Sequence, residues 1–443
     1  MQTHLISVLS ILLLFLVGFL SSFVAHVLVL LEKTRVTVGG SFSITGHARN
    51  EDCIREHGMM RETPVCLVGN VAVSPLALEN IERMAPNSIG CVLERFNLSD
   101  TGLINILPKL RVHKDCEIEY LNLSASEEAH VAEVLKQKNP FCVGRVKNMD
   151  LKEYAVGVIT KMNLKDCEIE TLILTASEEA HVAAVLKQEN PFCVGRVKDM
   201  WLGDYAVGVI TKMSLKDCEI ERLDLTAYEK EHVAEVLAQE KPFCVGRVKN
   251  MFLWAYAASV ITKMSLKDCE IESLSLTAYE KEHVAEVLAQ EKPFCVGRVK
   301  TMELGYYAVG VITKMSLKDC EIKYLSLYAN EEAHVAAVLA QEKPFCVGRV
   351  KDMRLWDYAV SVITKMTIHE DNTMESFVLR GNEDQLSRIL KEGDNSIELG
   401  RIRTGGLRVP EKIKRKLRYT LVDGEGKEVL EEEEPSQRGN LLE

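Results

Sequence analysis

The feature of this sequence that most limits its fold is a repeat with a period of 51 residues. Five cysteines stand one period apart, and five others follow the same period. The two sets are Cys116, Cys167, Cys218, Cys269 and Cys320, and Cys142, Cys193, Cys244, Cys295 and Cys346. Repeated units stack along one axis, so a chain of 443 residues need not be divided into several compact domains.

Each 51-residue block divides into two halves of one design. The first half has the pattern I-E-x-L-x-L, as in Ile220–Leu225, followed by a helical pattern at Glu231–Leu237. The second half has V-K-x-M-x-L, as in Val248–Leu253, followed by a second helical pattern at Tyr256–Met264. Alternating apolar residues predict a strand that is buried on one face, and the spacing that follows predicts a helix.

The L-x-x-L-x-L pattern, with alternating steps of 28 and 23 residues, resembles the leucine-rich repeat, whose units have 20–29 residues. The helical second half of each unit resembles the ribonuclease-inhibitor-like subclass, and the resemblance covers about residues 62–418. It implies an α/β solenoid in the shape of a horseshoe, with a parallel β-sheet on the concave face and helices on the convex face. One departure from the family is that Ser126, Ser177 or Tyr228 stands where Asn or Cys is usual.

Five segments are expected along the chain. Strands should start at Val68 and regularly thereafter, and two degenerate repeats should begin near Met374 and Leu399. A basic helix at 410–418, opened by a proline, would close the array. The segments are a hydrophobic membrane anchor or signal segment at 1–35, an N-terminal cap or degenerate first repeat at 36–67, repeats at 68–373, degenerate repeats and a cap at 374–418, and an acidic disordered tail at 419–443.

The N-terminal segment is strongly apolar. Residues 5–31 contain no Asp, Glu, Lys or Arg, which is long enough to cross a bilayer. A signal peptide usually has a basic start and a shorter apolar core, so we expect an uncleaved single-pass anchor, with a signal peptide, a buried helix or a wrongly assigned start as alternatives. Lys33 and Arg35 follow the apolar run, and the positive-inside tendency would then leave the repeats on the cytoplasmic side.

The two blocks 218–268 and 269–319 differ mainly at one kind of position. If the first apolar residue of each strand is position 0, positions 3 and 5 face the core and positions 2, 4 and 6 face outward. Five of these six outward positions differ between the blocks, for example Phe252 against Glu303 and Trp254 against Gly305. Neutral drift would tolerate such changes, but it would mostly yield small polar residues. We therefore interpret the outward face as a protein-binding surface.

The predicted binding residues are aromatic and basic side chains at or beside outward positions. Position 1 forms a ladder of alternating acid and base that ends at Lys323, so that three successive strands carry lysine and an acidic group is expected to bind there. Exposed aromatic side chains in a row are typical of binding hot spots. The predicted set is Tyr120, Trp201, Arg222, Phe252, Trp254, Lys300, Lys323, Tyr324, Tyr328, Lys351, Arg354 and Trp356.

Other recurring residues are interpreted as structural. We expect the cysteines to be free, buried thiols rather than disulfides, which suits a reducing compartment. A histidine column that includes His181 and His232 is expected on helix surfaces, because its members are too far apart to share a metal ion. The glycosylation sequons at Asn97 and Asn122 are interpreted as chance.

No nucleotide-binding, nucleophile-elbow or zinc-protease motif occurs in the sequence. We therefore expect no catalysis, cofactor or metal, and the net charge of −11 argues against nucleic acid as a partner. The expected function is that of a membrane-anchored protein that binds a protein ligand through its concave face, and the resemblance to recognition receptors implies ligand or pathogen sensing. A membrane-tethered scaffold for a signalling enzyme or small GTPase is the alternative, and a purely structural spacer is a third.

Overall fold

The computed structural model describes residues 42–44, 54–55, 65–69, 75–87, 89–91 and 93–429. The predicted anchor at 5–31 and the acidic run at 431–434 lie outside this part. No helix within the described part is long and apolar enough to span a membrane. The chain forms two compact units, one of residues 1–252 with 263–265 and one of residues 253–262 with 266–443.

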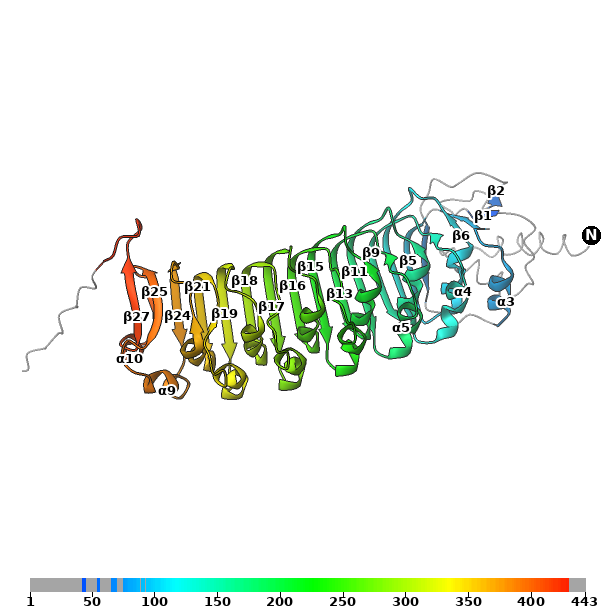
Figure 1. The fold of residues 1–443 in the computed structure, drawn as a ribbon. Coiled ribbons are helices and arrows are strands. Elements are labelled where there is room, and N and C mark those ends of the chain that lie inside the picture. The colour runs from blue at the N-terminus through cyan, green and yellow to red at the C-terminus, as the bar shows by residue number, and fades with distance from the viewer. Residues whose placement is uncertain are drawn as a thin grey trace, which may run out of the picture. The chain divides into compact units, whose positions relative to one another are not determined.

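The first unit has a sheet of parallel strands that stand side by side (Figure 1). In sheet order they are β3 (Val65–Gly69), β5 (Leu93–Ser99), β7 (Glu117–Ala125), β9 (Arg145–Glu153), β11 (Glu168–Ala176), β13 (Arg196–Asp204) and β15 (Glu219–Ala227). The boundary between the units falls within β16 (Arg247–Ala255). Strand β3 begins three residues before Val68, so the prediction for this strand start was wrong.

The second unit continues the same design with four parallel strands of nine residues each, followed by the shorter β24 and β26. Their order is β17 (Glu270–Ala278), β18 (Arg298–Tyr306), β19 (Glu321–Ala329), β21 (Arg349–Asp357), β24 (Ser376–Arg380) and β26 (Leu407–Arg408). The degenerate strand expected near Leu399 exists as β25 (Ile397–Arg403). It pairs with β23 (Thr373–Met374) and β27 (Leu417–Val422) in a separate sheet of three strands.

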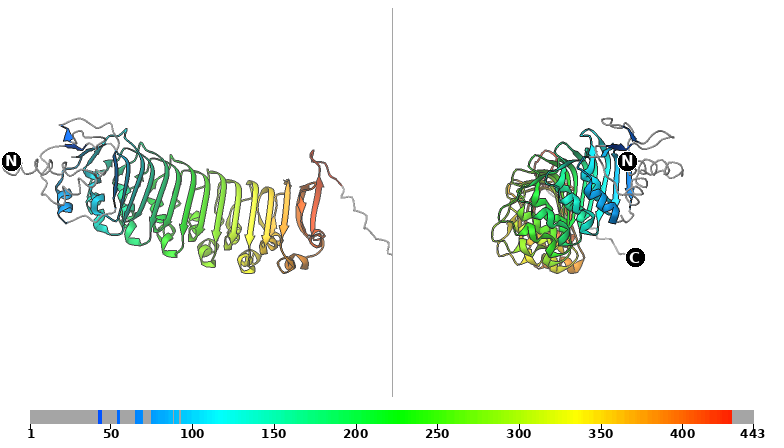
Figure 2. Two further views of the ribbon diagram at one scale, coloured as in Figure 1. Left: turned by 180° about the vertical axis from the view of Figure 1, so that it is seen from behind. Right: turned by 90° about the vertical axis from the view of Figure 1, so that its right-hand side faces the viewer.

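The helical segments are shorter than the family resemblance implies, and they lie along one side of each sheet (Figures 1 and 2). Each second half has a 3₁₀-helix of eight residues instead of an α-helix. A 3₁₀-helix rises about 2.0 Å per residue against 1.5 Å for an α-helix, so few residues cover the same length. These segments are η3 (Tyr154–Lys161), η4 (Tyr205–Lys212), η6 (Tyr256–Lys263), η8 (Tyr307–Lys314) and η10 (Tyr358–Lys365), with η1 (Gly102–Lys109) before them.

Four of the first halves have a short 3₁₀-helix followed by a four-residue α-helix, and the fifth has an α-helix of eight residues. They are η2 (Glu128–His130) with α4 (Ala132–Leu135), α5 (Glu179–Leu186), η5 (Lys230–Val233) with α6 (Ala234–Leu237), η7 (Lys281–Val284) with α7 (Ala285–Leu288), and η9 (Glu332–Val335) with α8 (Ala336–Leu339). Further helices are α3 (Pro75–Arg83), α9 (Glu383–Lys391) and α10 (Glu411–Lys414).

Small sheets complete the architecture. Strands β1 (Phe42–Ile44), β2 (Ile54–Arg55), β4 (Ile89–Cys91) and β6 (Leu110–Val112) form one of them. Three pairs of two-residue strands connect successive halves: β8 (Phe141–Cys142) with β10 (Met162–Asn163), β12 (Phe192–Cys193) with β14 (Met213–Ser214), and β20 (Phe345–Cys346) with β22 (Met366–Thr367).

The predicted strand register is confirmed. In β13, Met200 and Leu202 at positions 3 and 5 are buried, while Trp201 between them is exposed. The same alternation holds for Leu325 and Leu327 in β19, whose neighbour Tyr328 is exposed. Parallel pairing places equal positions side by side, so the leucine and methionine side chains stack into a continuous core within each unit. The outward face therefore carries the residues that vary between repeats.

A glycine at the start of each second-half strand explains part of the strict repetition. Gly195 has a φ of 72°, and a Cβ atom there would lie 2.6 Å from the carbonyl oxygen of Cys167. The next residue, Arg196, donates its N–H to that same carbonyl at 2.9 Å. The close approach of the two backbones leaves no room for a side chain, so only glycine fits.

Two predictions about side-chain burial and chain ends need correction. Cys167 and the other cysteines of its set are buried. Cys193, Cys244 and Cys295 of the other set are exposed, because these three lie on the short connecting strands or their equivalents. The ten cysteines between Cys116 and Cys346 are free thiols. The basic helix expected at 410–418 is only the four-residue α10, and β27 then extends to Val422, so the predicted disordered tail from 419 starts too early.

Candidate ligand-binding surface

The outward face of the long parallel strands carries, in both units, most of the exposed large hydrophobic side chains. In the described part of the chain there are six such residues. Three lie at outward strand positions, and two follow a strand directly. The six are Tyr120, Trp201, Tyr328, Tyr228, Tyr279 and Val429. Aromatic side chains are thus concentrated on the surface that the sequence predicted.

In the first unit, three predicted residues form one cluster around a guanidinium group. The Cζ atom of Arg222 lies 4.8 Å from the ring centroid of Trp201 and 4.6 Å from that of Phe252. A cation between two aromatic faces gains from the negative charge of both π systems. We call Trp201, Arg222, Asp224 and Phe252 the Arg222 cluster.

Asp224 is the member of this cluster that sequence reasoning missed. It stands at an outward position, yet it is only 8% exposed, because Arg222 lies over it. Nη2 of Arg222 donates a hydrogen bond to Oδ2 of Asp224 at 3.0 Å. Nε of Arg222 is buried and has no hydrogen-bond partner. The two residues stand two apart on one strand, the spacing that puts side chains on the same face.

The second unit brings together a larger group of predicted residues. Tyr328 pairs in register with Trp356, and Ser326 pairs with Arg354, so these outward side chains are neighbours across β19 and β21. The Cζ atom of Arg354 lies 5.1 Å from the ring centroid of Tyr324. We call Lys323, Tyr324, Tyr328, Lys351, Arg354, Trp356 and Arg380 the Arg354 patch.

Arg380 joins this patch from the degenerate repeat and was not predicted. Its Cζ atom lies 5.2 Å from the ring centroid of Trp356, with which it pairs in register. Tyr306 is a second unpredicted aromatic residue beside the patch. Its ring contacts those of Tyr279 and Tyr328, with centroids 4.9 Å and 5.4 Å away. Arg380 and Tyr306 were missed because neither residue lies at position 2, 4 or 6 of a regular strand.

Three predicted residues lie apart from these groups. Tyr120 stands at an outward position of β7, where the Cζ atom of Arg95 lies 5.4 Å from its ring centroid. Trp254 occupies outward position 6 of β16 in the second unit and is half-buried. Nζ of Lys300 lies 3.5 Å from a carboxylate oxygen of Glu272.

The predicted ladder of acid and base at position 1 is formed in part. Nζ of Lys249 lies 3.7 Å from Oε1 of Glu221, and Lys300 pairs with Glu272 as above, whereas Lys147 pairs with Glu117 instead of Glu119. A second ladder, one residue before position 0, was missed; it pairs Arg196 with Glu168, Arg247 with Glu219, and Arg298 with Glu270. All these side chains are exposed, so each pair contributes at most about 1 kcal/mol.

The histidine column does not lie on helix surfaces, and that prediction was wrong. Four histidines are buried, and each packs edge-on against a tyrosine of the preceding 3₁₀-helix with ring centroids 4.5–4.6 Å apart. Their Nδ1 atoms accept hydrogen bonds from backbone N–H groups three residues earlier. They therefore cap the start of each helical turn. The pairs are His181 with Tyr154, His232 with Tyr205, His283 with Tyr256, and His334 with Tyr307.

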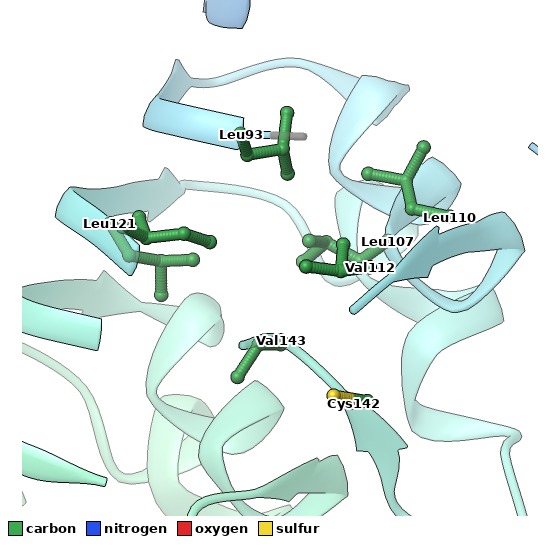
Figure 3. A pocket seen from close by; sticks show the side chains of 8 residues that line it. Leu93, Leu107, Leu110, Val112, Leu121, Cys142 and Val143 are labelled. Atoms are coloured by element: carbon green, nitrogen blue, oxygen red, sulfur yellow. The ribbon is translucent and has the colours of Figure 1, made fainter. Parts of the chain in front are cut away.

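A small apolar space lies inside the first unit between η1, β6 and β7 (Figure 3). It is lined by Leu93, Leu107, Leu110, Val112, Ile118, Leu121, Cys142 and Val143. A charged or hydroxyl side chain is not among them, so this space belongs to the packing of the core and lacks the convergent polar groups of a binding pocket.

The described residues contain no group of three or more His, Cys, Asp or Glu side chains placed to hold a metal ion. The chemistry of both clusters is that of an open contact surface: planar aromatic rings with guanidinium groups held against them. Comparisons with known proteins add no family: no protein-family model, no curated protein and no solved structure matches the chain.

Proposed function

We propose that this chain is a leucine-rich repeat protein that binds a protein ligand through the outward faces of its sheets. The observation that carries the proposal is that five of the six exposed large hydrophobic residues of the described part lie on or next to those faces. Monomeric proteins rarely leave aromatic side chains together in water unless a partner covers them. The buried leucine pattern and the repeating strand–helix unit support the leucine-rich repeat assignment.

The Arg222 cluster supports a protein rather than a small molecule as the ligand. Trp201 is 42% exposed, and its ring stands beside a guanidinium that is already stacked and hydrogen-bonded. Tryptophan and arginine dominate binding hot spots, because they offer large rigid surfaces with little conformational entropy to lose. An open sheet face offers a partner area but no enclosed cavity, as non-enzymatic recognition requires.

The experiment is a capture of interacting proteins with the full chain and two variants. In Trp201→Ala/Phe252→Ala, we expect loss of one stoichiometric partner, with an affinity decrease of about 2 kcal/mol or more once that partner is purified. The matched control is Phe192→Ala, which removes a half-buried aromatic residue of β12 in the same unit. Circular dichroism establishes that all three chains fold.

Three outcomes count against the proposal. If Phe192→Ala lowers capture as much as the double variant, the loss reflects stability and not a contact. If several partners bind and all are indifferent to Trp201→Ala/Phe252→Ala, the chain is a scaffold that uses other surfaces. A complete absence of stoichiometric partners would support a spacer.

We also propose that residues 5–31 anchor the chain in a membrane with the repeats on the cytoplasmic side. The uninterrupted apolar run supports this placement, as do Lys33 and Arg35 directly after it. In intact microsomes, a C-terminal tag should be digested by added protease, and the sequons at Asn97 and Asn122 should carry no glycan. A protected tag or a mobility shift after glycosidase treatment would overturn the orientation.

A further inference from the structure

Four cationic side chains of the Arg354 patch lack a counter-ion among the residues that the structure describes. Lys323, Lys351, Arg354 and Arg380 stand on three adjacent strands, β19, β21 and β24. Within the described part of the chain, no carboxylate forms an ion pair with any of them. The repeats elsewhere pair most such cations with acids, so this stretch of the second unit is an exception.

Arg354 and Arg222 form a natural comparison. Both guanidinium groups stack on an aromatic ring, and both have a buried Nε atom without a hydrogen-bond partner. Arg222 hydrogen-bonds to the carboxylate of Asp224, whereas Arg354 makes no ion pair with any described residue. A half-buried charge without a counter-ion is costly, and a bound anion removes that cost.

The acidic residues around Arg354 do not serve as its partner. Asp352 stands two residues earlier on the same strand, and Glu303 faces Ser326 on the neighbouring one. Neither makes an ion pair with Arg354. Ser326 pairs in register with Arg354 and is a small neutral residue, so the position nearest the guanidinium on β19 is open to a carboxylate from outside.

The aromatic residues define the rest of the site. Tyr328 is 37% exposed and pairs in register with Trp356, and both stand two positions further along the strands than Ser326 and Arg354. Alternate residues of an extended chain lie about 6.7 Å apart, the same spacing as alternate positions of these strands. A ligand carboxylate on Arg354 would therefore place a nearby apolar side chain against Tyr328 and Trp356.

We propose that the Arg354 patch binds an extended acidic segment of a partner protein, in which carboxylates flank an aromatic residue. This inference rests on the proposed function and names the chemistry of one of its sites. The chain as a whole has a net charge of −11, so a large polyanion would be repelled, whereas a short acidic segment meets mainly the local cations. The charge complementarity of the patch is what selects this partner.

The test uses the full chain and a fluorescein-labelled peptide, EEFEE, with its neutral analogue QQFQQ as control, followed by fluorescence anisotropy. We expect EEFEE to bind about tenfold or more tightly than QQFQQ, with an affinity that falls as salt is added. Arg354→Gln should weaken the binding of EEFEE about tenfold. Arg298→Gln is the matched arginine control, because it removes an exposed arginine of the same unit that is paired with Glu270, and it should leave this affinity unchanged.

A second pair of variants keeps Arg354 and changes only its surroundings. Ser326→Asp supplies an internal carboxylate, as Asp224 does for Arg222, and should weaken EEFEE about tenfold. Ser326→Asn has a similar size without charge and should bind as the wild type does. Equal binding of both peptides, or unchanged affinity in Arg354→Gln and Ser326→Asp, would overturn the inference.

The chain's own acidic run is the competing occupant. If replacing Glu431, Glu432, Glu433 and Glu434 by glutamine tightens EEFEE binding about tenfold, the C-terminal segment occupies the patch and the assignment to a partner protein is wrong. The outcome is separable from that of the proposed function. Loss of acidic-peptide binding with an intact partner dependent on Trp201 rejects this site alone.

Discussion

The imidazole of His283 packs edge-on against the ring of Tyr256, with the ring centroids 4.5 Å apart. Its Nδ1 atom accepts a hydrogen bond from the backbone N–H of Glu280 at 3.3 Å. Burial lowers the pKa of His283 from its usual value of 6.5, and the carboxylates of Glu280 and Glu282 oppose this shift only in part. The folded chain therefore holds this histidine neutral.

The pKa of His283 makes stability depend on pH. Between pH 6.5 and the lowered pKa of the folded chain, the unfolded chain binds a proton that the folded chain does not, so the free energy of unfolding falls as the pH decreases through this range. Denaturant titrations at about pH 7.5 and 5.5 should show this loss. His283→Asn keeps a hydrogen-bond acceptor but does not titrate, so its loss should be smaller. An unchanged pH slope in this variant would refute the assignment.

Removing the side chain of Arg222 should make the buried Asp224 carboxylate destabilise the fold. Arg222→Ser leaves a buried carboxylate without its hydrogen bond, and because Arg222 is partly exposed we expect a cost of about 1–3 kcal/mol. The double variant Arg222→Ser/Asp224→Ser copies Ser273 and Ser275 of the next block and should recover part of this loss. Chemical denaturation measures both. A double variant as unstable as the single one would show that stacking on Trp201, and not the ion pair, matters.

Replacing Ala255 by glycine should not lower the stability of the chain. It has a φ of 54°, where residues with a Cβ atom are strained. We expect Ala255→Gly to leave stability unchanged or raise it by about 1 kcal/mol. Ala278 occupies the equivalent last position of β17, is equally buried and is not among the positive-φ residues, so Ala278→Gly should lower stability by about 0.5–1 kcal/mol. Equal effects of the two changes would contradict this account.

The two cysteine sets should react at different rates. Cys193, Cys244 and Cys295 are exposed, whereas burial protects Cys167 and Cys218 and raises the pKa of both thiols. The thiolate is the reactive form, so both effects slow alkylation. Brief iodoacetamide treatment followed by peptide mass spectrometry should modify the exposed set first. Equal labelling of the two sets in the native chain would show that the difference in cysteine exposure between them is wrong.

The strand register could be predicted because alternation is a local property of an extended chain. Met200 and Leu202 had to share one face and Trp201 the other, whatever the neighbouring repeats do. The histidines could not be placed in the same way. His232 lies in a segment with a helical pattern, but its burial depends on Tyr205, which arrives from the preceding half-repeat.

The ion-pair partners of the charged residues could not be predicted from the sequence either. The pattern at position 1 predicted that Lys147 would pair with Glu119. Lys147 pairs instead with Glu117, which lies two residues before Glu119 on β7. Long side chains choose among several carboxylates at similar distances, and small differences in geometry decide between them. The 3₁₀ geometry of η3 has a similar origin, because the length to be covered between two strands is set by the stacking of repeats.

The sequence by itself determined the period, the alternation of strands and helical segments, and which residues face outward, because these follow from local geometry repeated many times. Only the tertiary structure decided that Arg222 has a carboxylate beneath it and that Arg354 has none. Both arginines belong to similar strands with similar aromatic neighbours. Each arginine has an aspartate two residues away on its own strand, Asp224 for Arg222 and Asp352 for Arg354, yet only the first pair forms a hydrogen bond. The rings that neighbouring strands place against each guanidinium belong to its surroundings, and contacts across strands are made only when the chain has folded.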